Sequence, residues 1–256
     1  LSDALVEYQL AVWAIDRERM LDEWSHAQHG LAEVCYQLIF VEDTDSSRLA
    51  QRGLDAITAA LAGWHEADDK IGCAKAEAVR GNLFTWMADA DGAGRHEHLR
   101  GAADAYANAM EAANVVDDFD LYGAVGALYG ETCWALAHEP GEQPARVLKR
   151  ALQGLSESSR AVSCDDRPDS WVAIRMMAAQ VLIELAEHLP KRASEFWGEA
   201  FRSAWAAWSA LEFRGSIRNA SAQAAREILV TLRDLIGDVF DVFWEESDFG
   251  ARPEWL

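Results

Sequence analysis

Basic residues are scarce in this sequence. Its 256 residues contain 23 Lys and Arg against 43 Asp and Glu, a formal charge of -20 at pH 7. A chain of this charge repels phosphate backbones and anionic lipids, so nucleic acid and membrane surfaces are excluded as expected partners. A neutral or basic protein partner fits this charge better.

Long apolar runs and secretory cysteine patterns are also missing. No apolar run reaches the roughly 20 residues that a membrane-spanning helix requires, and the N-terminal Leu1-Ser2-Asp3 lacks the residue order of a signal peptide. The cysteines show no C-x-x-C spacing, which argues against a zinc ribbon or a disulfide framework and favours buried small side chains. These cysteines are Cys35, Cys73, Cys133 and Cys164. We therefore expect a cytoplasmic protein without a cofactor.

A 49-residue period organises the chain. Bulky residues stand at positions 24, 73, 122 and 171 and small residues at 32, 81, 130 and 179, so each column advances by 49 without a gap. Within each unit, apolar residues recur at spacings of three and four, which is typical of an amphipathic helix. Because half of the chain is hydrophobic, a sizeable core is available, and each unit is predicted to be a helix pair.

The predicted fold is all-α: an α-solenoid of about ten helices in tandem antiparallel pairs. The first helices are expected at 22–40, 70–89, 119–138 and 169–188, and the second helices at 46–66, 95–114, 144–162 and 192–212. Residues 3–19 match a second helix, and 217–236 match a first helix. The expected division is a half repeat 1–21, repeats 22–70, 71–119, 120–168 and 169–217, a final helix 218–236, and an acidic, aromatic tail 237–256.

The two ends of the array each leave two interpretations open. The sequence begins in mid-repeat without a methionine, so it is either a fragment of a longer protein or a chain whose half repeat serves as a cap. The tail 237–256 mixes acidic with aromatic residues. It is expected either to cover the last repeat as a cap or to insert into a neighbouring subunit as a hook.

The stretch Trp24-Ser25-His26-Ala27-Gln28-His29-Gly30-Leu31-Ala32 sets a bulky residue early in a helix and small residues where helices cross. In this it resembles the tetratricopeptide repeat (TPR) superfamily, in the long-helix bacterial variety found in signalling and protease-associated proteins. The units are longer than the usual repeat of about 34 residues and lack its proline after the second helix. The resemblance implies a right-handed superhelix whose first helices line a concave groove that binds peptides or partner domains.

A polar column within the first helices is the predicted binding surface. One residue of the column lies in each repeat, and aromatic residues follow three or four positions later as possible anchors. The alternative for the aromatic residues is packing between helix layers. The predicted partner-binding residues are Glu33, Tyr36, Asn82, Trp86, Glu131, Trp134 and Gln180. The two glutamates favour a neutral or basic peptide or partner domain.

Two histidine pairs are weak candidates for a metal site. His26 and His29 stand three apart, and His96 and His98 two apart, but neither pair has a convincing third ligand. No metal site is therefore predicted.

Paired aspartates raise the alternative of a helical enzyme. Asp68-Asp69 and Asp117-Asp118 resemble the aspartates by which helical prenyl-diphosphate enzymes hold magnesium, yet both pairs fall at repeat boundaries, where acids cap helices. No nucleophile or phosphate-loop motif is present. We therefore predict a protein-interaction scaffold or regulatory module rather than an enzyme. A helical enzyme with an acidic metal-diphosphate site and a structural subunit of a homo-oligomer remain the alternatives.

Overall fold

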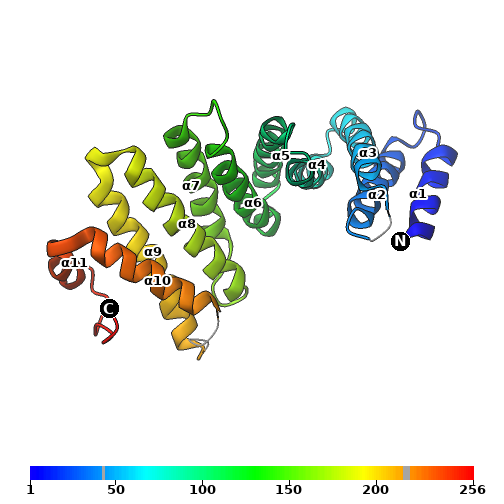
Figure 1. Ribbon diagram of the computed structural model, residues 1–256. Helices are drawn as coiled ribbons and strands as arrows, with labels where there is room; N and C mark the ends of the chain where they lie inside the picture. The colour runs from blue at the N-terminus through cyan, green and yellow to red at the C-terminus, as the bar shows by residue number, and fades with distance from the viewer. Residues whose placement is uncertain (42–43, 216–219) are drawn as a thin grey trace. The chain divides into compact units, whose positions relative to one another are not determined.

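The computed structural model describes residues 1–41, 44–215 and 220–256 (Figure 1). Over these ranges the chain forms α-helices and short 3-10 turns, with no β-strand. The helices are α1 (Ser2–Ala14), α2 (Leu21–Leu38), α3 (Ser46–Ala67), α4 (Lys70–Ala90), α5 (Arg95–Val115), α6 (Phe119–Ala137), α7 (Pro144–Ala161), α8 (Pro168–His188), α9 (Ala193–Phe213), α10 (Ala220–Ile236) and α11 (Phe240–Glu246). The prediction of an all-α array is confirmed. None of the described helices is long and apolar enough to span a membrane.

The helix ends follow from the residues that stand at the repeat boundaries. The Asp69 carboxylate accepts hydrogen bonds from the backbone N–H groups of Ile71 and Gly72, both at 3.0 Å, and so caps α4. Asp118 caps α6 by accepting from the backbone N–H of Leu121 at 3.0 Å. The predicted capping role of these aspartate pairs is therefore confirmed for their second members.

The first aspartate of each pair turns the chain out of the preceding helix. Asp68 has a φ of 55° and Asp117 a φ of 57°, both in the left-handed region. Aspartate tolerates this conformation better than most residues, since its short side chain can bond locally. Proline acts at two other boundaries, because Pro144 and Pro168 occupy the first turns of α7 and α8.

The chain divides into two compact units, Leu1–Pro140 (unit 1) and Gly141–Leu256 (unit 2). In unit 1 each helix from α1 to α6 contacts the next, and the most extensive contacts join α2 to α3 and α4 to α5. In unit 2 successive contacts run from α7 to α10, with α8 and α9 the most extensively packed pair. The pairs α2–α3, α4–α5 and α8–α9 are three of the four that the 49-residue period predicts. The boundary between the units falls inside the predicted repeat 120–168, between its two helices.

The small-residue column of the repeat lets large side chains enter between paired helices. In α4, a Cβ at Gly81 would lie 2.6 Å from Cδ1 of Tyr106, whose side chain is 1% exposed. One repeat earlier, the corresponding residues are Ala32 and Ile57, which are fully buried in one apolar cluster. Between these two repeats, the smaller residue in the small column accompanies the larger side chain in the second helix.

The acidic, aromatic tail packs against α9 of its own unit. The ring of Phe201 is fully buried and is surrounded by Phe240, Phe243, Trp244 and Phe249, with centroids between 5.3 and 6.0 Å away. The Trp244 indole N–H also donates to the carbonyl of Gly250 at 3.2 Å. These contacts are those expected of a cap.

Two sequence expectations need correction. Helix α1 ends at Ala14 and not at residue 19, because Ile15 is extended and Asp16 closes a turn in which its carboxylate accepts from the Glu18 N–H at 3.1 Å. Three cysteines are buried as expected, whereas Cys164 is half-buried, since it lies in the turn before α8. The first residues of the predicted final helix, 218 and 219, lie outside the described residues.

Candidate partner-binding surface

The first helices of unit 1 lie next to one another. Helix α4 contacts α2 on one side and α6 on the other, in addition to its contacts with the second helices α3 and α5. Side chains on the common face of α2, α4 and α6 therefore form one surface, to which the predicted column belongs. We call this face the first-helix surface.

The predicted polar column is partly free and partly engaged. Glu33 and Glu131 are exposed on α2 and α6, and a Glu33 carboxylate oxygen lies 3.8 Å from Nδ1 of His29 on the same helix. Asn82 is half-buried on α4, where its side-chain oxygen accepts a hydrogen bond of 2.8 Å from the hydroxyl of Tyr106. Gln180 is exposed on α8, which belongs to unit 2, so it is not grouped with the other three.

Tyr106 is the buried residue that organises this column, and it was not among the predicted site residues. Its hydroxyl donates to Asn82 and lies 3.3 Å from the hydroxyl of Thr85. Burial raises the pKa of the Tyr106 phenol far above its ordinary value, and the nearby Tyr36 and Glu131 raise it further. The phenol is therefore a permanent hydrogen-bond donor beneath the surface, and it lies close to residues of three successive first helices. The sequence signal that could have revealed Tyr106 is a side chain with a polar hydroxyl at the position that Ile57 occupies in the preceding repeat.

The predicted aromatic residues are half-buried, so each presents part of its ring to solvent. Tyr36 meets Phe40 edge-on with centroids 5.3 Å apart, and Phe40 is 64% exposed. Trp86 packs against the apolar core between α2, α3 and α4. Trp134 meets the ring of His138 edge-on at 5.5 Å. Each predicted ring thus packs partly against its own chain, and a role as an anchor for a partner stays a prediction. Phe40 is a further exposed ring, beside Tyr36.

The first-helix surface has few basic residues. The sequences of α2 and α6 contain no Lys or Arg. Helix α4 contains three, of which Lys70 pairs with Asp68 and Arg80 with Glu77, both at 2.7 Å, and Lys75 is exposed. Unit 1 as a whole has 9 basic against 25 acidic residues, a formal charge of -16, whereas unit 2 has 14 against 18, a formal charge of -4. The acidity of the chain is therefore concentrated in unit 1.

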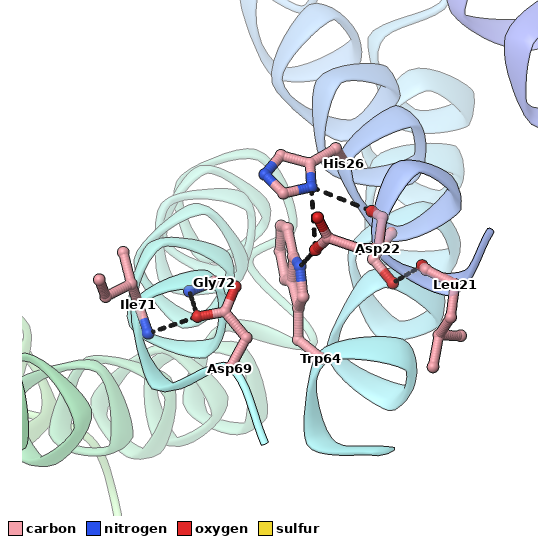
Figure 2. Close-up of polar contacts among 8 residues, drawn as sticks. Leu21, Asp22, His26, Trp64, Asp69, Ile71 and Gly72 are labelled. Atoms are coloured by element: carbon pink, nitrogen blue, oxygen red, sulfur yellow. Dashed lines mark hydrogen bonds and ion pairs between the residues drawn. The ribbon is translucent and has the colours of Figure 1, made fainter. Parts of the chain in front are cut away.

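A second polar cluster in unit 1 surrounds Trp64 (Figure 2). The Trp64 indole N–H donates to the Asp22 carboxylate at 3.4 Å, and the His26 ring meets the indole edge-on with centroids 5.2 Å apart. The Trp64 ring also covers Gly72, where a Cβ would lie 2.6 Å from an indole carbon. These contacts join α2, α3 and α4, so the cluster holds the helices together.

Neither a nucleophile nor a metal site emerges from the histidines and cysteines beside Trp64. The Sγ of Cys73 lies 3.6 Å from Nδ1 of His65. Burial raises the pKa of the Cys73 thiol, so its protonated form is favoured over the reactive thiolate. Burial likewise lowers the pKa of His29 and keeps its imidazole neutral. Among the described residues, no three His, Cys, Asp or Glu side chains gather closely enough to hold a metal ion.

No protein-family model matches the sequence, and no curated protein matches it. The structure by itself shows an all-helical array of neighbouring helix pairs, which is compatible with a helical repeat fold.

Proposed function

We propose that this chain is a TPR-like interaction scaffold whose first-helix surface binds a neutral or basic segment of another protein. The observation that carries the proposal is the chemistry of α2, α4 and α6. Exposed carboxylates at Glu33 and Glu131 lie on helices without Lys or Arg, and partly exposed aromatic rings accompany them. Aromatic anchors and complementary charge are the features that give an interface its affinity and its orientation.

The tightly packed base beneath the surface supports the same function. Tyr106 fixes Asn82 from below through a bond of 2.8 Å, so the amide N–H groups of Asn82 remain as donors in a defined orientation. A partner then meets preorganised donors and acceptors, which lowers the entropy lost on binding. A basic side chain of the partner would pair with Glu33 or Glu131, and an apolar side chain would contact Tyr36, Trp86 or Trp134.

Selection from a random peptide library displayed on phage tests the proposal. We expect peptides selected on the wild-type chain to be rich in Lys, Arg and aromatic residues. The variant Glu33→Lys/Glu131→Lys should bind these peptides at least about 10-fold more weakly by calorimetry, because attraction becomes repulsion. The binding should also weaken as salt is raised.

The matched control changes the same charge on another surface. Glu97 and Glu111 are exposed on the second helix α5, so Glu97→Lys/Glu111→Lys alters the net charge equally and leaves the first-helix surface intact. Its affinity for the selected peptides should stay within about 2-fold of wild type. Equal losses in the two variants would show a response to net charge alone, and unchanged affinity in the Glu33/Glu131 variant would refute this surface as the binding site.

A structural subunit of a homo-oligomer is a second candidate, favoured by an apolar stripe on α1. Val6, Leu10 and Trp13 are 53%, 59% and 86% exposed and follow one face of the helix at spacings of four and three. A second copy of the chain could cover this stripe. If so, light scattering should show a dimer that dissociates in the variant Leu10→Glu/Trp13→Glu; a monomeric wild type at all concentrations would exclude this candidate.

A further inference from the structure

Two cavities of this chain occupy equivalent places in the repeat. One of about 430 Å³ lies in unit 1 between α3, α4 and α5, and one of about 310 Å³ lies in unit 2 between α7, α8 and α9. Six of the eight residues that line the first have a counterpart in the second 98 residues later, which is twice the period. Examples are Leu54 and Leu152, Phe84 and Leu182, and Asp104 and Arg202.

The charges of the two cavities are opposite. Asp104 on the wall of the unit 1 cavity corresponds to Arg202 in unit 2. Glu77, the ion-pair partner of the lining residue Arg80, corresponds to Arg175, again 98 residues later. Both acidic positions of unit 1 are thus occupied by arginine in unit 2. The residues that line the unit 2 cavity include two arginines, Arg175 and Arg202, and one carboxylate, Glu199. The lining therefore carries an excess of one positive charge.

In unit 1 the buried charge is compensated within the chain. Arg80 lines the cavity and pairs with Glu77 at 2.7 Å, and Asn108 donates a further hydrogen bond to Glu77 at 3.3 Å. An opposite charge therefore accompanies the Arg80 guanidinium in the folded protein.

In unit 2 the Arg175 guanidinium has no such carboxylate partner among the described residues. Arg175 is half-buried, and its Nε–H is buried without a hydrogen-bond acceptor among the described residues. Its guanidinium lies 5.0 Å from the ring centroid of Trp171, which orients it, and burial lowers its pKa, with no carboxylate of the described chain raising it. Removing a cation from water without an anionic partner is costly, and an anion that enters the cavity would offset this cost.

We propose that the unit 2 cavity binds the carboxylate of a short apolar acid, which is either a free small molecule or the end of a partner chain. Arg175 and Arg202 would contact the carboxylate, with the Ser156 hydroxyl as a further donor. Leu152 and Leu182 provide apolar contacts for the carbon chain. The single excess charge matches one carboxylate better than a phosphate dianion, which Glu199 would repel. The cavity is lined by residues of α7, α8 and α9, none of which belongs to the first-helix surface of α2, α4 and α6, so the two proposed sites share no residue and do not depend on each other.

Arginine side-chain NMR reads the proposed contact directly. The full chain is titrated with butyrate while the Nε–Hε resonances are followed in ¹H–¹⁵N spectra, with Arg175→Lys used to assign the signal. We expect the Arg175 resonance to shift saturably with butyrate and to remain in place with the neutral isostere butyramide. Arg202→Gln, a change at an exposed position, should weaken butyrate binding about 10-fold or more.

Arg80 is the internal control, because its Nε–H is also buried without a hydrogen-bond acceptor although its charge is paired. Its resonance should not move. The absence of a saturable Arg175 shift, an equal shift of Arg80, or binding of inorganic phosphate without binding of butyrate would each overturn the proposal. N-acetyl-leucine and its amide distinguish the sources. Tighter binding of the acid than of butyrate identifies the end of a partner chain, and equal or weaker binding identifies a free small acid.

Discussion

Replacing Gly81 by Ala tests the packing rule that shapes unit 1. In a helix, Ala is ordinarily more stable than Gly by about 0.5–1 kcal/mol. Here the added Cβ would lie 2.6 Å from Cδ1 and 2.8 Å from Cζ of Tyr106. That ring cannot move aside easily, because it is 1% exposed and its hydroxyl is fixed by Asn82 at 2.8 Å. Overpacking of this kind costs about 1–3 kcal/mol, so Gly81→Ala should lower the free energy of unfolding by about 1–2 kcal/mol.

The neighbouring repeat supplies the compensating change. Since Ala32 and Ile57 occupy the corresponding positions, Tyr106→Ile makes room for a methyl group at position 81. In the Tyr106→Ile background, Gly81→Ala should therefore stabilise the protein by about 0.5–1 kcal/mol, its ordinary helix effect. The change that Gly81→Ala makes to the free energy of unfolding should thus have opposite signs in the wild-type and Tyr106→Ile backgrounds. The difference corresponds to a coupling energy of about 1.5–3 kcal/mol between the two positions.

Native-state hydrogen exchange of the α4 and α5 amides is the suitable assay, because it reports opening of this helix pair in a chain with two compact units. Gly92→Ala is the control, since no atom lies within 4 Å of a Cβ at that position; its effect should stay within about 0.5 kcal/mol. The reasoning is refuted if Gly81→Ala stabilises the wild type, or if it has the same effect in both backgrounds.

Three further predictions concern a titrating group, a cap and the tail. Burial lowers the pKa of His29 from its ordinary 6.5, so the unfolded state binds more protons than the folded state as the pH falls through this value. The free energy of unfolding, measured by urea titration, should therefore fall as the pH drops from about 7.5 to about 5.5, and the fall should be smaller in His29→Gln. Asp118→Ala removes the cap of α6 and should cost about 1 kcal/mol, seen as faster exchange of the Leu121 amide, and an unchanged exchange rate would contradict the capping role. Phe201→Ala should cost about 3–5 kcal/mol and release the tail to proteolysis, whereas Phe213→Ala, at a side chain 93% exposed, should do neither. A tail equally resistant in both variants would show that the aromatic cluster does not hold it.

The sequence predicted the helices well because their determinants are local and repeated. Apolar spacing of three and four fixed the helical faces, and aspartates and prolines fixed most ends to within two or three residues, as Asp69 and Pro144 illustrate. The failure at α1 has the same local nature: a turn around Asp16 ended the helix, although its match to later repeats predicted continuation to residue 19. The binding role of the predicted surface residues stays a prediction.

Other features depend on side chains brought together from distant parts of the chain, and only the tertiary structure decided them. The sequence places Asn82 in a polar column, but its bond to Tyr106, 24 residues away, arises from the packing of α4 on α5. The 49-residue period relates Glu77 to Arg175 as equivalent positions, yet it does not say that one is paired and the other is not. Periodicity fixes which residues are equivalent, because it records the repeated backbone. The chemistry of each copy is set by the neighbours of its side chains, and these vary from repeat to repeat.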